Sequence, residues 1–305
     1  MTKPLVCFVI PSLGAGGTER QLLYLLKGLV DTYEPMVICT RSEGFWAEDA
    51  RRMGRVVALG TRGGWDPRLK YRLRKLFETY GPSVVHSFMF GFDYAVNVAA
   101  RDVGVPVVVS SRRQLASWKK PRHIRVQQKA NGLVDAIVAN GRVVAEYAAE
   151  QEACPVEDYT VILNGIDAEQ FRSNLVSRET RQRYRIPLKK RVVGIVANFS
   201  QVKDHVLFVD TARELSKRRG DLHFVMVGDG PEKGTIGALL REYGIQDSVT
   251  GITTLSELKD VYRLIDIAVL TSRSEGFPNV VMEAMASGTP VVVANVGGVP
   301  ELIRQ

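Results

Sequence analysis

The 305-residue chain contains no long hydrophobic run, and none of its apolar stretches approaches the roughly 18–20 residues that a membrane-spanning helix needs. Its first apolar run, residues 5–10, is too short for the hydrophobic region of a signal peptide, and no small-residue cleavage site follows it. Hydrophobic residues make up 45% of the chain, as in globular proteins. We therefore expect a soluble, cytoplasmic protein that is long enough for two domains, each with its own core.

Cysteine and histidine are scarce, with three and four residues. Cys7 and Cys39 fall in predicted strands, and with Cys154 they are expected as small core residues in a reducing compartment. Neither residue type has the spacing of a metal site, and no Ser-His-Asp or Cys-His arrangement is suggested by spacing. The sequence therefore predicts no bound metal and no nucleophile triad.

Acidic residues are few in two segments of this chain, whose net charge is +8. Residues 51–75 contain nine basic residues and one acid, and residues 112–129 contain seven basic residues and no acid. Such an excess favours an anionic partner, which could be a membrane surface, a lipid phosphate or nucleic acid. The alternative is a solvated charged face without a partner.

Short apolar runs rich in Val and Ile alternate with helical patterns along the chain, which indicates parallel strands covered by helices on both faces. The first series of predicted strands comprises residues 5–10, 36–40, 56–59, 84–86, 107–110, 136–139 and 159–163. The second comprises residues 192–198, 222–227, 248–250, 267–271 and 290–294. Between them lie the turn Asn164-Gly165 and a polar stretch, residues 167–191, without a strand pattern. We predict an α/β fold of two Rossmann-like, doubly wound domains, residues 1–165 and 166–305.

Two carboxylates lie eight positions apart in Ser272-Arg-Ser-Glu-Gly-Phe-Pro-Asn-Val-Val-Met-Glu283. The preceding apolar run predicts a strand, so Glu275 falls in the loop and Glu283 on the following helix. Gly276 permits a close backbone approach, and Pro278 suits the first turn of that helix. Free amides at a helix start favour an anion such as a diphosphate, whereas carboxylates accept hydrogen bonds from hydroxyl groups. The pattern thus predicts a site for a phosphorylated sugar or nucleotide.

This stretch resembles the E-x7-E motif of the family-four retaining glycosyltransferases, which have the GT-B fold, and the match continues through Gly297-Gly298-Val-Pro-Glu301. The resemblance implies that Glu283 holds ribose hydroxyls and Glu275 holds sugar hydroxyls. It also implies that Lys203 and the amides of residues 277–280 bind the diphosphate. The donor-binding set implied in this way is Gly16, Gly17, Asn198, Lys203, Gly228, Gly230, Ile252, Glu275, Gly276, Phe277, Pro278, Asn279, Val280 and Glu283.

The first predicted strand ends in a glycine-rich loop that contains Gly14, Gly16 and Gly17, and Thr18 can cap the helix that follows. A dinucleotide site would need a third glycine and an acid after the second strand, where Arg41 stands instead, so a nicotinamide cofactor is disfavoured. The loop resembles the family's loop that faces the donor phosphates and the acceptor. The alternative is a loop kept tight for packing only.

The resemblance departs from the family pattern at two positions. Where the family often has His-x-His, this chain has His86-Ser87-Phe88, so His86 could act only from the first position. The family's Arg before the matched Lys203 is replaced by Asn198 or Ser200. The catalytic set implied is Glu275, Lys203 and His86, with helix amides and Lys203 neutralising the leaving diphosphate.

No Asp-x-Asp occurs in the sequence, so the metal-diphosphate motif of GT-A transferases is missing. We expect a metal-independent, retaining hexosyltransferase that uses a nucleoside diphosphate sugar and needs no cofactor. The acceptor is expected to be a glycan or a lipid-linked molecule, and nucleic acid is not an expected partner. The alternatives are a GT-B nucleotide-sugar epimerase and a nucleotide-sugar-binding or regulatory protein without turnover.

The basic segments, which include Trp65 and Trp118, are predicted to meet an anionic membrane surface, with Arg112, Arg113 and Trp118 on the acceptor or membrane side. This predicts a protein peripheral to the inner face of the membrane. In the family, the segment matched by residues 297–303 is followed by another βα element and a helix that returns to the first domain. We therefore expect the C-terminal domain to be incomplete within these 305 residues.

Overall fold

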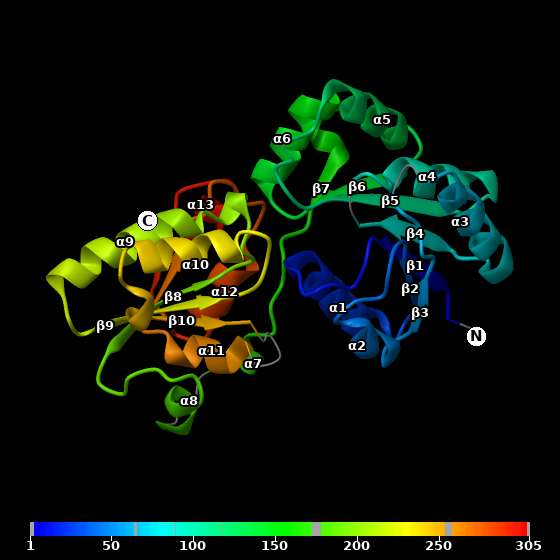
Figure 1. The fold of residues 1–305 in the computed structure, drawn as a ribbon. Coiled ribbons are helices and arrows are strands. Elements are labelled where there is room, and N and C mark those ends of the chain that lie inside the picture. Colours follow the sequence, from blue (N-terminus) through cyan, green and yellow to red (C-terminus); the bar gives the residue numbers. More distant parts are fainter. Residues whose placement is uncertain are drawn as a thin grey trace. The chain divides into compact units, whose positions relative to one another are not determined.

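The structure is a computed structural model that describes residues 3–63, 66–88, 90–116, 118–172, 178–253 and 258–303. The chain divides into two compact units, Met1–Gly165 and Ile166–Gln305, called unit 1 and unit 2 (Figure 1). The division follows the turn at Asn164-Gly165, where the strand pattern of the sequence stops.

Unit 1 contains a seven-stranded parallel sheet in the order β3-β2-β1-β4-β5-β6-β7. Its strands are β1 (Leu5–Ile10), β2 (Glu34–Cys39), β3 (Arg55–Ala58), β4 (Val84–Ser87), β5 (Val107–Arg112), β6 (Ala136–Ala139) and β7 (Tyr159–Val161). Its helices are α1 (Gly17–Leu29), α2 (Ala47–Arg51), α3 (Pro67–Tyr80), α4 (Asp93–Asp102), α5 (Pro121–Asn131), α6 (Arg142–Glu152) and the 3₁₀ turn η1 (Val156–Asp158).

Unit 2 contains a five-stranded parallel sheet in the order β10-β9-β8-β11-β12. Its strands are β8 (Arg191–Val196), β9 (Leu222–Val227), β10 (Val249–Ile252), β11 (Ile267–Leu270) and β12 (Val291–Val293). Its helices are α7 (Ala168–Phe171), α8 (Arg178–Arg183), α9 (His205–Arg218), α10 (Lys233–Glu242), α11 (Leu258–Leu264), α12 (Asn279–Ala286) and α13 (Val299–Leu302), with 3₁₀ turns η2 (Gln201–Lys203) and η3 (Gln246–Ser248).

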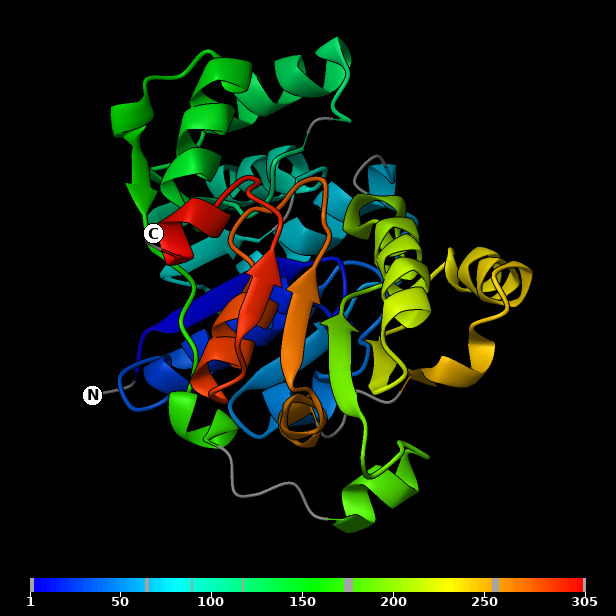
Figure 2. The same ribbon diagram turned by 90° about the vertical axis from the view of Figure 1, so that its left-hand side faces the viewer.

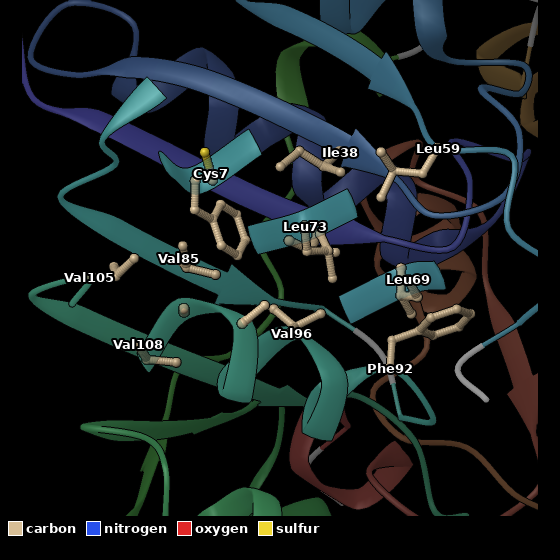
Figure 3. Packing of buried hydrophobic residues seen from close by; sticks show 14 of the residues in the cluster. Cys7, Ile38, Leu59, Leu69, Leu73, Val85, Phe92, Val96, Val105 and Val108 are labelled. Atoms are coloured by element: carbon tan, nitrogen blue, oxygen red, sulfur yellow. The ribbon is translucent and has the colours of Figure 1, made fainter. Parts of the chain in front are cut away.

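Strands inside the sheets, such as β1, β8 and β9, are buried because helices cover both faces, as the unbroken Val and Ile runs predicted, whereas the edge strands β3, β7 and β12 are partly exposed. Figure 3 shows one side of the unit 1 core, where Cys7, Val85 and Val108 of the sheet pack with Leu73 of α3 and Val96 of α4. A separate cluster lies on the other face of the same sheet, beneath α1 and α2. Two further clusters cover the two faces of the unit 2 sheet. The two-layer burial explains why each strand tolerates few polar residues.

The twelve predicted strands are all present, with ends that agree within two residues. The prediction that Thr18 caps α1 is wrong, because the cap position lies two residues earlier, at Gly16, which makes no side-chain hydrogen bond. Pro278 likewise stands at the cap position of α12 rather than inside its first turn. The loops before both helices therefore reach the helix start with backbone rather than capping side chains.

Candidate active site

Each sheet reverses its strand order at one point, between β1 and β4 in unit 1 and between β8 and β11 in unit 2. Open parallel sheets bind ligands at the carboxyl ends of the strands beside such a reversal, because the two loops there lead to helices on opposite faces. In Figure 2 the arrows of β8 (yellow-green), β11 (orange) and β12 (red) point to the same end of unit 2. The loops after β8 and β11 carry Lys203 and Glu275.

The Lys203 ammonium lies 2.5 Å from Glu275 Oε1, although 72 residues separate the two in sequence. Ser272 Oγ donates to the same carboxylate oxygen at 2.5 Å. The Lys203 side chain keeps 25% of its surface exposed and Glu275 keeps 8%, so the pair lies at the edge of the unit with the cation outermost. The sequence predicted both residues in one site, and the structure brings them into direct contact.

The hydroxyl group of Thr271 joins the two loops that carry this pair. Its Oγ1 donates to the carbonyl oxygens of Lys203 and Asp204, at 2.9 Å each. Arg273 adds two bonds, from its amide to Val202 O at 2.8 Å and from Nε to Asp204 Oδ2 at 2.7 Å. The backbone positions of the cation and the carboxylate are therefore fixed relative to each other.

A glycine pair, Gly297-Gly298, supports the loop of Glu275 from behind. A Cβ at Gly297 would lie 1.8 Å from Glu275 O, and one at Gly298 would lie 2.0 Å from Gly276 O. Gly297 also has φ +52°, a conformation that favours glycine. The Gly298 amide donates to Glu275 O at 3.3 Å. The extended match through residues 297–301 therefore has a physical meaning, because it shapes the Glu275 loop.

Glu283 lies on α12 and is 2% exposed. Tyr262 of α11, itself 1% exposed, donates from its hydroxyl group to Glu283 Oε2 at 2.9 Å. Phe277, Pro278 and Asn279, at the start of the same helix, are also buried. The sequence placed Glu283 on this helix, as the structure has it. The structure gives Tyr262 a core position that also orients the Glu283 carboxylate.

The remaining predicted donor residues of unit 2 lie at the carboxyl ends of β8, β9 and β10. Gly228 and Gly230 have φ of +142° and +154°, and a Cβ at either would lie within 2.4 Å of a carbonyl oxygen of the β8 loop. Ile252 O accepts from the Gly228 amide at 2.9 Å, while Asn198 is exposed between these contacts. The three loops thus pack backbone against backbone around Asn198.

His205, at the start of α9, is a buried residue to which the sequence analysis gave no role. Its ring stacks on Phe199 at 4.2 Å between centroids and 15° between planes. Burial lowers its pKa to about 4, although the Ala197 backbone acts in the opposite direction. The ring is therefore neutral near pH 7 and supports the β8 loop by stacking. Its position two residues after Lys203 was the only available sequence signal.

In unit 1 the glycine-rich loop after β1 bends around Glu19 of α1. A Cβ at Gly16 would lie 2.2 Å from a Glu19 carboxylate oxygen, and Gly17 begins the helix. Burial raises the pKa of Glu19, while its own backbone amide and the charge of Arg113 act in the opposite direction. Gly16 is thus needed to leave room for this carboxylate, a packing role that stands beside the predicted approach to a ligand.

His86 Nε2 lies 2.8 Å from Ser111 Oγ, and its ring packs with Phe8 and Phe88. Burial lowers the pKa of His86 to about 3, and the nearby charge of Arg113 adds to this effect. The imidazole is therefore neutral near pH 7, and a base with so low a pKa is poorly matched to proton transfer there. The structure limits the predicted catalytic role of His86 to hydrogen bonding.

Arg112 is 5% exposed and lies in a buried charge network of unit 1, so it does not present its charge to a membrane surface. Its Nε and Nη2 donate to Glu152 at 2.9–3.1 Å, and Nη2 also donates to Asn131 Oδ1 at 2.7 Å. Nη1 donates to Asp93 Oδ2 at 3.3 Å and to Ser111 O at 3.2 Å. These bonds use the whole guanidinium group, which leaves it no capacity for a phosphate.

Glu152 collects the donors of this buried network. Lys119 Nζ, Asn131 Nδ2 and Tyr159 Oη donate to it at 2.9–3.2 Å, in addition to Arg112. Burial alone would raise the pKa of Glu152, but the attraction of Arg112 and its hydrogen bonds, followed by Lys119, hold the pKa below its ordinary value. The carboxylate is therefore ionised near pH 7 and ties α6 to the loop after β5.

The other two residues predicted for the acceptor side, Arg113 and Trp118, lie on that same loop. Arg113 lies over the Phe88 ring at 5.5 Å, and its Nη2 donates to Asn164 Oδ1 at 2.5 Å. Trp118 is 55% exposed and packs edge-on against Phe90 and His123. Trp65, in the first basic segment, lies outside the described residues. Arg113 and Trp118 thus lie beyond the carboxyl end of β5, and their role on an acceptor or membrane side stays a prediction.

Comparison with known proteins identifies the chain. A family model described as Glycosyltransferase Family 4 matches residues 15–170, more than half of the chain, and one described as Glycosyl transferases group 1 matches residues 176–305. The chain belongs to glycosyltransferase family 4. The two matches fall on unit 1 and unit 2, and they contain the glycine-rich loop and the Glu275–Glu283 motif, respectively.

Curated relatives and solved structures agree with this family. The chain is 30% identical over 225 residues to the putative glycosyltransferase EpsF of Bacillus subtilis (strain 168), covering 70% of this chain and 57% of that protein. It is 29% identical over 199 residues to the lipopolysaccharide core biosynthesis mannosyltransferase LpsB of Rhizobium meliloti (strain 1021), covering 64% and 52%. The match thus spans a little over half the length of these family-four relatives.

The structure of Anabaena Alr3699/HepE in complex with UDP-glucose matches with a TM-score of 0.86 at 20% identity, covering 99% of this chain and 83% of that chain. At this identity the likeness concerns the fold, and the predicted fold class, two Rossmann-like parallel-sheet domains of the GT-B type, is confirmed. Within the described ranges, the family-four chain has no helix with the length and apolar character needed to span a bilayer.

Proposed function

We propose that this chain transfers a hexose from a nucleoside diphosphate sugar to a glycan or lipid-linked acceptor. The observation that carries the proposal is the Lys203–Glu275 pair at the strand-order reversal of unit 2, next to the start of α12. A cation and a helix start at one edge suit the diphosphate of a nucleotide sugar, because phosphates need positive charge, and the carboxylate beside them suits the sugar hydroxyls, which need acceptors.

In this proposal, Lys203 and the backbone at the start of α12 bind the diphosphate, and Glu275 accepts hydrogen bonds from the hexose. Glu283, held by Tyr262, accepts from the ribose. Without donor, Lys203 and Glu275 neutralise each other at 2.5 Å. A bound diphosphate would compete for the ammonium and leave the carboxylate to the sugar. The geometry therefore predicts that donor binding breaks this ion pair.

We also propose that transfer retains the anomeric configuration and needs no metal. The support is that Lys203 and the helix start can neutralise the charge that develops on the leaving diphosphate. Activity should then survive a chelator, and the anomeric proton of the product should show the configuration of the donor by NMR. Inactivation by EDTA with rescue by Mg²⁺ or Mn²⁺ would contradict the first point, and an inverted product the second.

The deciding experiment is a thermal-shift panel of UDP-, GDP- and ADP-sugars, because specific binding stabilises the folded state. Turnover of the best donor is then measured with and without candidate acceptors. Transfer or donor hydrolysis supports the transferase. An epimerised donor formed without acceptor supports an epimerase, and binding alone supports a regulatory protein.

A matched pair of lysine variants links the donor to the site. Lys203→Ala should weaken donor binding at least about tenfold, because a charged hydrogen bond contributes about 1.5–3 kcal/mol. Lys217→Ala, on exposed α9 surface, should leave donor binding unchanged. Equal donor affinity in both variants would show that Lys203 does not bind the donor.

An anionic membrane surface is the partner that we propose for the basic segments. The support is that Trp118 is 55% exposed next to α5, where Arg122 and Arg125 are exposed, and that Tyr71 on basic α3 is 68% exposed. Each basic residue near such a surface contributes about 1 kcal/mol, screened by salt. The chain should co-sediment with anionic but not neutral liposomes, and less at high salt. Equal binding to both kinds of liposome argues against this partner.

A further inference from the structure

The start of α1 and the loops after β4 and β5 line a recess in unit 1 that is open to solvent and has a cavity volume of about 30 Å³. The rings of Phe88 and Phe90 form part of its wall, and its charged lining residues are all cations, namely Arg112, Arg113 and Lys119. The recess lies at the strand-order reversal of the unit 1 sheet, where a parallel sheet places ligands. Its occupant therefore meets aromatic carbon and positive charge together.

Two of the three cations are already neutralised. Arg112 is bonded to Glu152 and Asp93, and Lys119 lies 3.1 Å from Glu152 with its ammonium 4.4 Å from the Phe90 ring centroid. Both side chains are at most 5% exposed, so they are held inside the unit. Their role is to fix the loop that forms the wall of the recess.

Arg113 differs from these neighbours because no ion pair joins it to a carboxylate within the described parts of the chain. Its Nε is buried and has no acceptor among those residues. Burial lowers the pKa of Arg113 to about 10, an effect larger than the opposing attraction of Glu19. A half-buried cation without an ion pair is costly, and such a group commonly marks the place where a ligand supplies negative charge.

We propose that this recess binds an oxyanion of the acceptor, a carboxylate or a phosphate, and that Arg113 is the residue that contacts it. The inference rests on the proposed function, because it assigns a substrate class to the acceptor. A guanidinium group presents a planar fork that matches both kinds of oxyanion. Phe88 and Phe90 pack against the carbon skeleton that carries the anion. The acceptor is thus an acidic molecule rather than a neutral glycan.

The test measures phosphate binding by thermal shift on the full chain at constant ionic strength. The nucleoside diphosphate that stabilises the chain most is present at saturation, so that phosphate does not report on the donor site. Sodium phosphate should then raise the Tm further and saturably, and sodium acetate serves as the carboxylate probe. Arg113→Gln should weaken binding of the stronger probe at least tenfold. The matched control Arg122→Gln, on exposed α5, should bind it like the wild type.

The outcomes separate this inference from the proposed function. If the chain binds a donor but neither phosphate nor acetate, the proposed oxyanion site is wrong, while the proposed transferase function is unaffected. Loss of nucleoside diphosphate affinity in Arg113→Gln assigns Arg113 to the donor and also overturns the inference. If Arg113→Gln fails to fold, probe binding is measured with Arg113→Lys. This variant keeps the positive charge but lacks the planar, two-pronged donor geometry of the guanidinium group. Several-fold weaker probe binding supports the inference, and wild-type affinity overturns it.

Discussion

At the ligand-binding end of unit 1 the loops are held by buried charges, whereas at the same end of unit 2 they are held by glycine backbones in direct contact. Glu152 joins Arg112 and Lys119 across 40 and 33 residues of sequence. In unit 2, Gly297 and Gly298 touch the Glu275 loop without any side chain between them. Side-chain networks leave a recess whose shape depends on partners far away in sequence. The glycine contacts of unit 2 also join separate segments, such as Gly297 and Glu275, but they do so through the backbone.

The largest expected effect comes from breaking the charge network of unit 1. Glu152→Ala leaves Arg112 and Lys119 buried without their shared carboxylate, which should lower the free energy of unfolding by about 3–5 kcal/mol. Glu146→Ala, on the same helix but in an exposed pair with Arg142, should cost less than about 1 kcal/mol. Urea unfolding of both variants measures the difference. Similar losses would mean that the network does not stabilise unit 1.

The matching change in unit 2 is Gly297→Ala. The new Cβ overlaps Glu275 O and the positive φ is retained, so overpacking of about 1–3 kcal/mol should add to the strain. Gly288→Ala has φ +74° but meets no atom within 4 Å, so it isolates the strain alone, about 1 kcal/mol. Urea unfolding and donor binding are measured together. We expect only Gly297→Ala to lose donor affinity. An unchanged affinity in this variant would show that the glycine pair does not position the donor site.

Glu283→Ala tests whether a buried carboxylate of unit 2 serves a ligand or the fold. We expect at least tenfold weaker donor binding, corresponding to about 1.5–3 kcal/mol for a charged hydrogen bond. Glu242→Ala, exposed at the end of α10, is the control. The affinity for a nucleoside diphosphate is measured by calorimetry. This ligand carries the ribose but not the transferred sugar, so a loss of affinity reports on the ribose contact. If the bare nucleotide binds Glu283→Ala as well as wild type, the ribose role is wrong.

Acid should destabilise both units through buried histidines, which are His86 in unit 1 and His205 and His223 in unit 2. The pKa values of His86 and His205 are lowered to about 3 and about 4, so below about pH 6.5 the unfolded chain binds protons that the folded chain does not. Stability therefore falls as the pH falls, by about 1.4 kcal/mol per pH unit for each histidine. His205→Phe should remove the contribution of His205 to the loss of stability between pH 6.5 and 4 and leave that of His223. An unchanged pH slope in urea unfolding would contradict the buried, neutral state.

The comparison also explains what the sequence could predict. The strands followed from runs of Val and Ile, because burial on both faces is a local pattern, and the Glu275 loop followed from a motif whose glycines pack against that loop. The inward position of Arg112 could not be predicted, because it depends on Glu152 and Asp93, which are unremarkable acids in the sequence. Thr18 was predicted as a cap from the cap preference of threonine alone. The sequence could not show that the Glu19 carboxylate lies against Gly16.

The Thr271 hydroxyl group has a consequence for protein engineering. Because it bonds to the backbone of both Lys203 and Asp204, the loops after β8 and β11 are held in fixed positions relative to each other. Gly297-Gly298 packs against the second of these loops. A transplant of residues 271–276 into another family member would carry Glu275 without the backbone that sets its position. An exchange of donor preference between relatives would therefore have to move three segments as a single cassette, residues 197–205, 271–276 and 297–298.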